Sequence, residues 1–150
     1  NPEGMLTPGL SRLKKGNAIY HTRAFGKFTA AEKASVWIAT GTGVAPFLSM
    51  MRSGITDGNI LIQGNRSPER LFFSDEISEL MGKAYHPCTS RVKADNMFFG
   101  RVTDYLQNNN LYFPEKPYYL CGNAEMVVEV RDLLISRGIP FGNIMAEIFF

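Results

Sequence analysis

From about residue 35 onward, short apolar runs alternate with stretches that carry apolar residues at helical spacing. Each apolar run has the length of a strand, and each amphipathic stretch between two runs has the length of a helix. Strands that are separated by helices pair in parallel through right-handed crossovers. The pattern therefore predicts an α/β fold built on a doubly wound parallel sheet.

The expected strands cover residues 36–39, 59–63, 118–121 and 144–150, with a weaker strand at 85–89. The expected helices cover residues 46–51, 69–81, 102–107 and 124–136. The helix at 69–81 is expected because its apolar residues have approximate helical spacing: Phe72, Phe73, Ile77, Leu80 and Met81. The helix at 124–136 has the clearest pattern, because its apolar residues form one stripe and Gly138 follows its end.

Residues 1–30 do not show this alternation of strands and helices, because glycine and proline interrupt them repeatedly. We expect a short helix at 10–14, and one or two strands at 18–22 and near Phe28. This segment is expected to be the tail of a preceding domain and a linker, and residues 31–150 to form a further domain. The sequence starts at Asn1 without a Met, which favours a fragment.

Composition argues against several classes of protein. With 45% hydrophobic and 20% charged residues, the chain is typical of a globular protein rather than a disordered one. A net charge of +2 is too small to attract nucleic acid in bulk. No apolar run approaches the ~20 residues that span a bilayer. We therefore expect no nucleic-acid partner and no membrane insertion, while the oligomeric state stays unknown.

The cysteines and histidines do not have the spacing of a metal site. Cys88 and Cys121 are far apart, and His21 and His86 each stand alone, so we expect no metal. One disulfide is conceivable, but a reduced, cytoplasmic protein is the favoured setting.

A glycine-rich turn connects the first expected strand to the first expected helix. It consists of Thr40, Gly41, Thr42, Gly43, Val44, Ala45 and Pro46. In such a turn, backbone N–H groups and the helix N-terminus can approach a pyrophosphate. The two glycines keep dinucleotide-binding spacing, but Pro46 stands where a third glycine would be. By itself the turn is equally compatible with a tight connection that binds no ligand.

Three segments in combination resemble the nucleotide-binding domain of the ferredoxin (flavodoxin)–NADP reductase family. They are TGTGVAPF at residues 40–47, LCGNAEM at 120–126 and EIFF at 147–150, and Ser90-Arg91 fits the same family. The resemblance covers about residues 36–150. Its most direct implication is a Rossmann-like domain that binds NADP(H).

The beginning of the chain resembles the flavin domain of the same family. Gly4, Met5, Leu6 and Thr7 are similar to its flavin-diphosphate motif, and residues 26–28 to the end of its flavin barrel. The resemblance thus implies that residues 1–30 are the C-terminal remnant of a FAD-binding β-barrel and linker. The earlier Arg-x-Tyr-Ser/Thr flavin motif is absent from the sequence. FAD is therefore expected in the intact protein, and this chain is expected to be an incomplete, inactive fragment.

The resemblance also implies roles for residues near the carboxyl end. Cys121 would lie beside the nicotinamide and help position it for hydride transfer to the flavin; a buried structural cysteine is the alternative. Gly122, Asn123, Glu125 and Met126 would belong to the same cofactor site.

Glu147 is a lone acid in an otherwise apolar strand, and a buried carboxylate is costly unless it is paired or protonated. By resemblance it would supply protons or position the nicotinamide; a surface-facing glutamate is the alternative. Phe149 and Phe150 would cover the flavin ring, and the alternative is a plain core role.

The choice between NADPH and NADH depends on cations. Arg66 follows the second strand in a segment without an acid, and an Asp or Glu there would favour NADH. By resemblance, Ser90 and Arg91 would bind the 2′-phosphate, for which arginine is well suited. Arg70 and Arg101 could add positive potential, although any single arginine can be a solvated surface charge.

Together these features predict an oxidoreductase domain that binds NADPH for hydride transfer to FAD. Ferredoxin or flavodoxin is the expected one-electron partner. One alternative is the NADH-dependent reductase component of an oxygenase, or a flavin or cytochrome reductase. Another is a non-catalytic NADP(H)-sensing module, which Cys121 and Glu147 disfavour because sensing needs neither.

Overall fold

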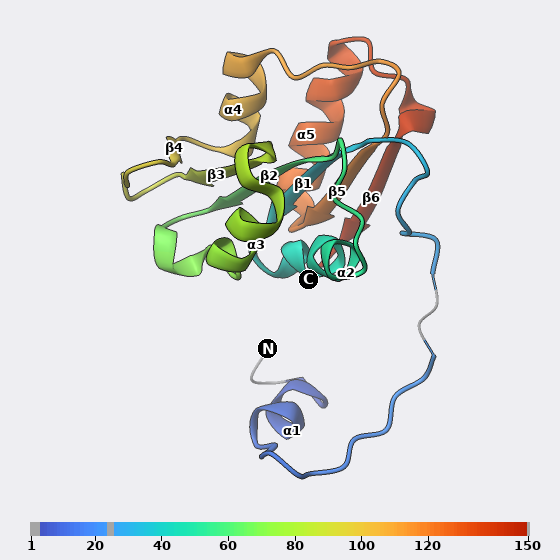
Figure 1. The fold of residues 1–150 in the computed structure, drawn as a ribbon, viewed down its shortest axis with the longest axis vertical. Helices are drawn as coiled ribbons and strands as arrows, with labels where there is room; N and C mark the ends of the chain where they lie inside the picture. The colour runs from blue at the N-terminus through green and yellow to red at the C-terminus, as the bar shows by residue number, and fades with distance from the viewer. Residues whose placement is uncertain (1–3, 24–25, 150) are drawn as a thin grey trace.

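The computed structural model of the chain describes residues 4–23 and 26–149. Within these residues, six strands form one parallel sheet in the order β4-β3-β2-β1-β5-β6 (Figure 1). The strands are β1 (Val36–Thr40), β2 (Ile60–Asn65), β3 (Tyr85–Thr89), β4 (Phe98–Phe99), β5 (Tyr118–Gly122) and β6 (Ile144–Ile148). The predicted doubly wound α/β fold is confirmed.

Helices cover both faces of the sheet (Figure 1). One face packs against α2 (Ala45–Arg52) and α3 (Ser74–Met81), and the other against α4 (Val102–Asn109) and α5 (Ala124–Ser136). Short 3₁₀ turns occur at η1 (Gly41–Val44), η2 (Pro68–Arg70), η3 (Gly82–Ala84) and η4 (Phe141–Asn143). In the described part of the chain, no helix has the length and apolar character needed to cross a membrane.

The core consists of two clusters, one on each face of the sheet. Along β1, Val36 and Ile38 belong to the cluster under α4 and α5, while Trp37 and Ala39 belong to the cluster under α2 and α3. All four side chains are fully buried. A central strand that is covered on both faces has a continuous run of apolar residues. This run is the pattern from which β1 was predicted.

The order of the strands reverses between β1 and β5. The chain runs from β1 outward through β2 and β3 to the edge strand β4, and then returns to add β5 and β6 on the other side of β1. In doubly wound sheets, ligands bind beyond the carboxyl ends of the strands at such a reversal. The fold therefore singles out the carboxyl ends of β1 and β5.

The predicted helix at 69–81 begins later than expected. Residues 68–70 form a 3₁₀ turn, and α3 starts only at Ser74, because Phe73 has a left-handed backbone with φ 61°. The Gln63 side-chain amide donates to the Phe72 carbonyl at 3.1 Å and fixes the connecting loop. Phe72 and Phe73 are consequently exposed, while Ile77 is buried as expected.

The described residues before β1 differ most from expectation. The short helix α1 (Thr7–Ser11) begins earlier than predicted, since Pro8 fits the first turn of a helix. The strands predicted at 18–22 and near Phe28 are wrong: both segments lie outside the described sheet, so they have no partner strand. Residues 17–23 are exposed, whereas Phe28 packs edge-on against Tyr119 with ring centroids 5.2 Å apart.

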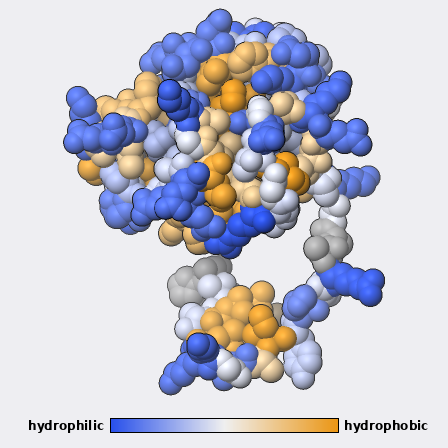
Figure 2. Space-filling model, viewed as in Figure 1, coloured by the Kyte–Doolittle hydropathy of each residue, from blue (hydrophilic) through white to orange (hydrophobic). Residues whose placement is uncertain are grey.

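The helix α1 lies apart from the sheet (Figure 1). None of its residues is buried, and Figure 2 shows hydrophobic side chains gathered on this part of the chain. Exposed apolar residues of this segment include Met5, Leu6, Leu10 and Leu13. The division into domains at residue 30 stays a prediction.

Candidate functional site

A pocket of about 390 Å³ opens at the reversal of strand order, beyond the carboxyl ends of the strands. Ten of the residues that the sequence nominated line it: Thr40, Gly41, Thr42, Arg66, Ser90, Gly122, Asn123, Glu125, Met126 and Phe149. The pocket thus brings together the glycine-rich turn, the end of β5 and the loops that follow β2 and β3.

The glycine-rich turn forms η1, which leads directly into α2. Gly41 opens it with φ 57°, a left-handed conformation that glycine adopts without strain. Gly41 and Thr42 line the pocket, whereas Val44 is buried, and Ala45 and Pro46 lie outside the lining. The first half of the predicted motif therefore faces the pocket, and the second half begins α2.

Gly43 serves the packing of the turn against β5. A Cβ atom at Gly43 would overlap the Cys121 carbonyl group and lie 2.7 Å from the Gly122 nitrogen. Only glycine permits this approach of two backbones. The spacing of glycines in the sequence could not distinguish this packing role from direct contact with a ligand.

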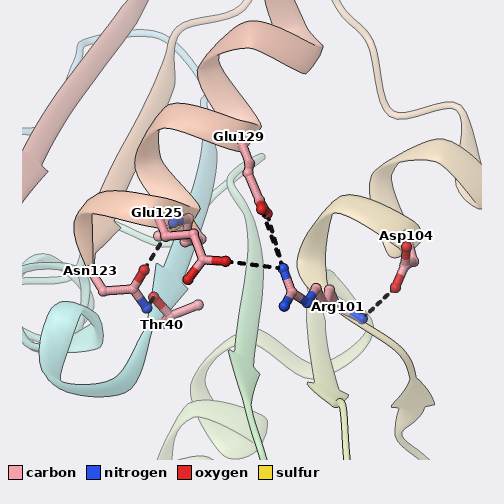
Figure 3. A network of polar contacts seen from close by, with 7 residues as sticks. Thr40, Arg101, Asp104, Asn123, Glu125 and Glu129 are labelled. Atoms are coloured by element: carbon pink, nitrogen blue, oxygen red, sulfur yellow. Dashed lines mark hydrogen bonds and ion pairs between the residues drawn. The ribbon is translucent and has the colours of Figure 1, made fainter.

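Asn123 organises the end of β5 (Figure 3). Its side-chain oxygen accepts a hydrogen bond from the Met126 N–H at 2.9 Å and caps α5. Its amide nitrogen donates to the Thr40 hydroxyl at 3.5 Å, across the reversal between β1 and β5. The Phe149 N–H donates to the Gly122 carbonyl at 2.8 Å, which joins the closing segment to the same edge of the pocket.

The loops that follow β2 and β3 lie side by side. The Ser90 N–H donates to the Asn65 carbonyl at 3.0 Å, and the Arg91 N–H donates to the Arg66 carbonyl at 2.9 Å. Arg66 and Ser90 line the pocket, while Arg91 is exposed just outside the lining. Within residues 4–23 and 26–149, neither arginine forms an ion pair.

Sequence reasoning missed part of the pocket. The lining also includes Gly64, Asn65, Gly100, Arg101, Val102, Thr103 and Glu129. Arg101 was considered only as a source of positive potential, but it lies in the pocket beside Glu125 and Glu129 (Figure 3). Glu129 follows Glu125 by one helical turn, a spacing from which its position could have been found.

Cys121 is fully buried beneath the pocket. Burial raises the pKa of its thiol to about 12, with a smaller contribution from Glu147, its neighbour in the register of β5 and β6. The thiol is therefore protonated near neutral pH, and it lies outside the pocket lining. Its role in hydride transfer stays a prediction.

Glu147 does not have the buried environment that the sequence suggested. It lies on the edge strand β6, whose last three residues are exposed, and its carboxylate faces solvent. The expectation of a costly buried acid is wrong, and the surface-facing alternative describes this residue in the chain. Its role near a nicotinamide stays a prediction.

The structure describes most of the residues for which a role at a flavin was expected. Phe149 is half-buried and packs on the core cluster that contains Cys121, while Phe150 lies outside the described residues. Gly4 to Thr7 lie on the segment apart from the sheet, and Met5 and Leu6 are strongly exposed. Within residues 4–23 and 26–149, no three His, Cys, Asp or Glu side chains come together as metal ligands.

Residues 37–132 match the family described as "Oxidoreductase NAD-binding domain". This match spans more than half of the chain and includes most of β1, the glycine-rich turn and most of α5. The chain belongs to this family. It is an oxidoreductase NAD-binding domain, and the sequence resemblance to ferredoxin–NADP reductases is confirmed by the relatives that follow.

The propane 2-monooxygenase reductase component of Rhodococcus jostii (strain RHA1) is 32% identical over 97% of the chain and 43% of its own length. The ferredoxin–NADP reductase of Pseudomonas aeruginosa is 28% identical over 97% of the chain and 67% of its own length. A solved ferredoxin NADP⁺ reductase from Neisseria gonorrhoeae, with bound FAD and NADP, is 31% identical with a TM-score of 0.68. That match covers 79% of this chain and 56% of the other. The chain thus spans only part of the length of these relatives.

Proposed function

We propose that the pocket binds NADPH and presents its nicotinamide to a flavin in the intact protein. The observation that supports this most directly is the pocket at the reversal of strand order, where a glycine-rich turn faces two adjoining arginine loops. NADPH needs both features: backbone N–H groups bind its pyrophosphate, and positively charged side chains bind its 2′-phosphate.

The residues of the pocket fit the phosphates of such a nucleotide. Gly41 and Thr42 would hold the pyrophosphate, at the start of the turn that leads into α2. Arg66, Ser90 and Arg91 would hold the 2′-phosphate, because the guanidinium fork matches phosphate oxygens and neither arginine is engaged by a described carboxylate. The Asn65–Arg66 segment carries no acid that would select a free ribose hydroxyl instead.

The nicotinamide would lie toward Cys121, Glu147 and Phe149. A flavin, when bound, accepts the hydride and can return the electrons one at a time. The buried Cys121 thiol stays neutral and contributes shape and contact rather than nucleophilic attack. Glu147 is exposed on β6, and its proposed role is to supply protons or to position the nicotinamide.

Met5 and Leu6, which resemble part of a flavin-diphosphate motif, are exposed on a segment that lies apart from the sheet (Figure 1). The expectation of FAD therefore rests on the resemblance and on the relatives. We infer that the chain binds nucleotide but does not turn over without the rest of a flavoprotein.

Cys88 and Cys121 are both free and buried, which supports a reducing, cytoplasmic setting.

Ferredoxin or flavodoxin is the proposed electron partner, supported by the ferredoxin–NADP reductase of Pseudomonas aeruginosa. A second candidate is an NADH-dependent reductase component of an oxygenase. The reductase component from Rhodococcus jostii and the toluate 1,2-dioxygenase electron transfer component of Pseudomonas putida favour it. Reduction of a panel of acceptors by the intact flavoprotein, with each nucleotide, distinguishes the two candidates.

Calorimetric titration of the chain with NADP⁺ and NAD⁺ at low salt tests the nucleotide preference. NADP⁺ is expected to bind more tightly, and Arg66→Ala and Arg91→Ala are expected to weaken NADP⁺ binding more than NAD⁺ binding. Arg131→Ala is the matched control, because Arg131 lies on α5 outside the pocket lining. Equal or tighter binding of NAD⁺ would contradict the preference for NADPH and support the second candidate.

The proposed role of Cys121 needs the intact flavoprotein. Cys121→Ser replaces the thiol with a hydroxyl and should slow hydride transfer, measured as flavin bleaching by NADPH in stopped flow. Cys88→Ser is the matched control, since Cys88 is equally buried but lies in the cluster on the other face of the sheet. An unchanged rate in Cys121→Ser would remove Cys121 from the proposed site.

A further inference from the structure

Arg101 is held in the pocket by two carboxylates (Figure 3). One guanidinium nitrogen, Nη1, lies 3.6 Å from Glu125 and 3.3 Å from both oxygens of Glu129. All three residues line the pocket. The ion pairs therefore occupy the space in which a ligand of the pocket would lie.

The backbone fixes both sides of this cluster. Arg101 directly precedes α4, and its N–H donates to the Asp104 carboxylate at 2.7 Å, which anchors the residue whatever its side chain does. Glu125 lies in the first turn of α5, where the helix dipole favours an acid, and Glu129 lies one turn further along the same helix. The charged groups can thus change partners without unfolding either helix.

The guanidinium has capacity for a further partner. Arginine carries five N–H donors, and the contacts with both glutamates use Nη1 alone. Within residues 4–23 and 26–149, the Nε and Nη2 groups of Arg101 donate to no acceptor. Side-chain exposures of 59% for Arg101, 72% for Glu125 and 41% for Glu129 mean that water screens these pairs. Exposed pairs are weak, so exchange for a stronger anion costs little.

The two glutamates also place negative charge in a pocket proposed to bind phosphate. Two carboxylates against one guanidinium leave a local charge of −1 in this corner of the pocket. An entering phosphate must overcome that repulsion or take Arg101 away from the carboxylates. Phosphate competes well, because arginine can bind it through two parallel N–H groups.

We propose that Glu125 and Glu129 form a carboxylate latch, which occupies Arg101 in the nucleotide-free chain and yields it to a phosphate group of the nucleotide. The latch rests on the function proposed above and makes these two glutamates determinants of affinity. Without them, Arg101 is available from the start and the repulsion is gone. Neutral glutamine at either position should therefore tighten nucleotide binding.

The test is calorimetric titration of the chain with NADP⁺ and with NAD⁺ at low ionic strength. Glu125→Gln and Glu129→Gln are each expected to bind NADP⁺ about two- to fivefold more tightly than the wild type, the range of exposed ion pairs. The gain should shrink in high salt, which screens exposed charges. Asp132→Asn is the matched control, because it removes an ion-paired carboxylate from the same helix outside the pocket lining. It should leave affinity unchanged.

The Arg101→Gln background separates the latch from a general effect of charge. If the latch operates through Arg101, Glu129→Gln gains less affinity in that background than in the wild type, because only the repulsion between carboxylate and phosphate is left to remove. A gain for NADP⁺ alone assigns the contact to the 2′-phosphate, and a gain for both nucleotides assigns it to the shared pyrophosphate. Urea unfolding of each variant verifies that the fold is intact.

Two results overturn the latch while leaving the proposed function in place. One is wild-type affinity in both glutamine variants, and the other is an undiminished gain of Glu129→Gln in the Arg101→Gln background. Failure of the wild-type chain to bind either nucleotide is a different outcome. It contradicts the proposed function of the pocket, and the latch fails with it.

Discussion

At the scale of single residues, the contact of Gly43 with β5 holds the glycine-rich turn in place. The turn supplies the pocket lining at Gly41 and Thr42, and β5 supplies it at Gly122. A side chain at Gly43 would overlap the Cys121 carbonyl group, so any larger residue must push the turn and the strand apart. The shape of the pocket therefore depends on the absence of a Cβ atom at position 43.

We predict that Gly43→Ala lowers the free energy of unfolding by roughly 1–3 kcal/mol, the usual cost of overpacking a close contact. Urea unfolding measures the change. Gly142→Ala is the control, because a Cβ at Gly142 meets no atom within 4 Å. A Gly43→Ala chain as stable as wild type would show that the turn can retreat from β5 without cost.

The two buried thiols make a prediction about alkaline pH. Burial raises the pKa of Cys88 and of Cys121 to about 12, with smaller contributions from Asp104 and Glu147 respectively. An unfolded thiol ionises near pH 8.5. Below that pH both states keep the proton; above it the unfolded chain loses the proton first. The free energy of unfolding should therefore fall as pH rises from about 8.5 toward 12.

Replacement of one thiol should make this decline less steep. Each raised thiol contributes up to about 1.4 kcal/mol per pH unit within that window. Urea unfolding of Cys88→Ala across the window should give a shallower slope than wild type, although the variant starts from a lower stability at about pH 8.5. Val130→Ala is the control for the lost core volume, since Val130 is fully buried and has no titrating group. Equal slopes for Cys88→Ala and wild type would contradict the raised pKa.

At the scale of elements, the N-terminus of α5 contributes both to the stability of the fold and to the lining of the pocket. Asn123 caps the helix through the Met126 N–H and also reaches Thr40 at the end of β1. Glu125 and Glu129 extend from the same end of the helix toward Arg101 at the start of α4. The start of α5 thus positions polar groups from several elements at one edge of the sheet.

We expect Asn123→Ala to lower the free energy of unfolding by about 1 kcal/mol, because the Met126 N–H loses its acceptor. Asn123→Ser should recover most of the loss, since a serine hydroxyl can cap the same group. Urea unfolding of the three chains decides between capping and an effect of side-chain size. A serine variant as destabilised as the alanine variant would argue against the cap.

The sequence predicted elements well where local pattern and burial agree. The helix at 124–136 was predicted with its observed bounds, because its apolar stripe faces the core and Gly138 follows its end. The helix at 69–81 was predicted too long, because the left-handed backbone of Phe73 depends on the loop around it. The exposure of Glu147 could not be predicted, because whether a strand lies at the edge of a sheet is set by strand order.

The pocket was predicted in part for the same reason. Gly41 and Arg66 could be nominated because each follows a strand, and the carboxyl ends of parallel strands meet at one edge. Ser90 was nominated by the family resemblance. Arg101 follows β4, a strand of two residues that is too short to give a periodic signal. Its position beside Glu125 and Glu129 depends on how the long loop between β3 and α4 folds back.

At the scale of the whole molecule, the topology places the pocket and the carboxylate latch at one end of the sheet. The order β4-β3-β2-β1-β5-β6 reverses between β1 and β5, and the pocket opens there. The opposite end of the sheet carries other exposed groups, including Asp57, Gly58 and Leu80. We propose that nucleotide binds at the carboxyl ends of the strands and not at this opposite end.

The most direct test is a titration of the isotope-labelled chain with NADP⁺, followed by the backbone amide chemical shifts. We expect the largest changes at the amides around the pocket, which are those of Gly41, Thr42, Arg66, Ser90 and Gly122. The largest changes at Asp57, Gly58 and Leu80, or no saturable change at all, would contradict it.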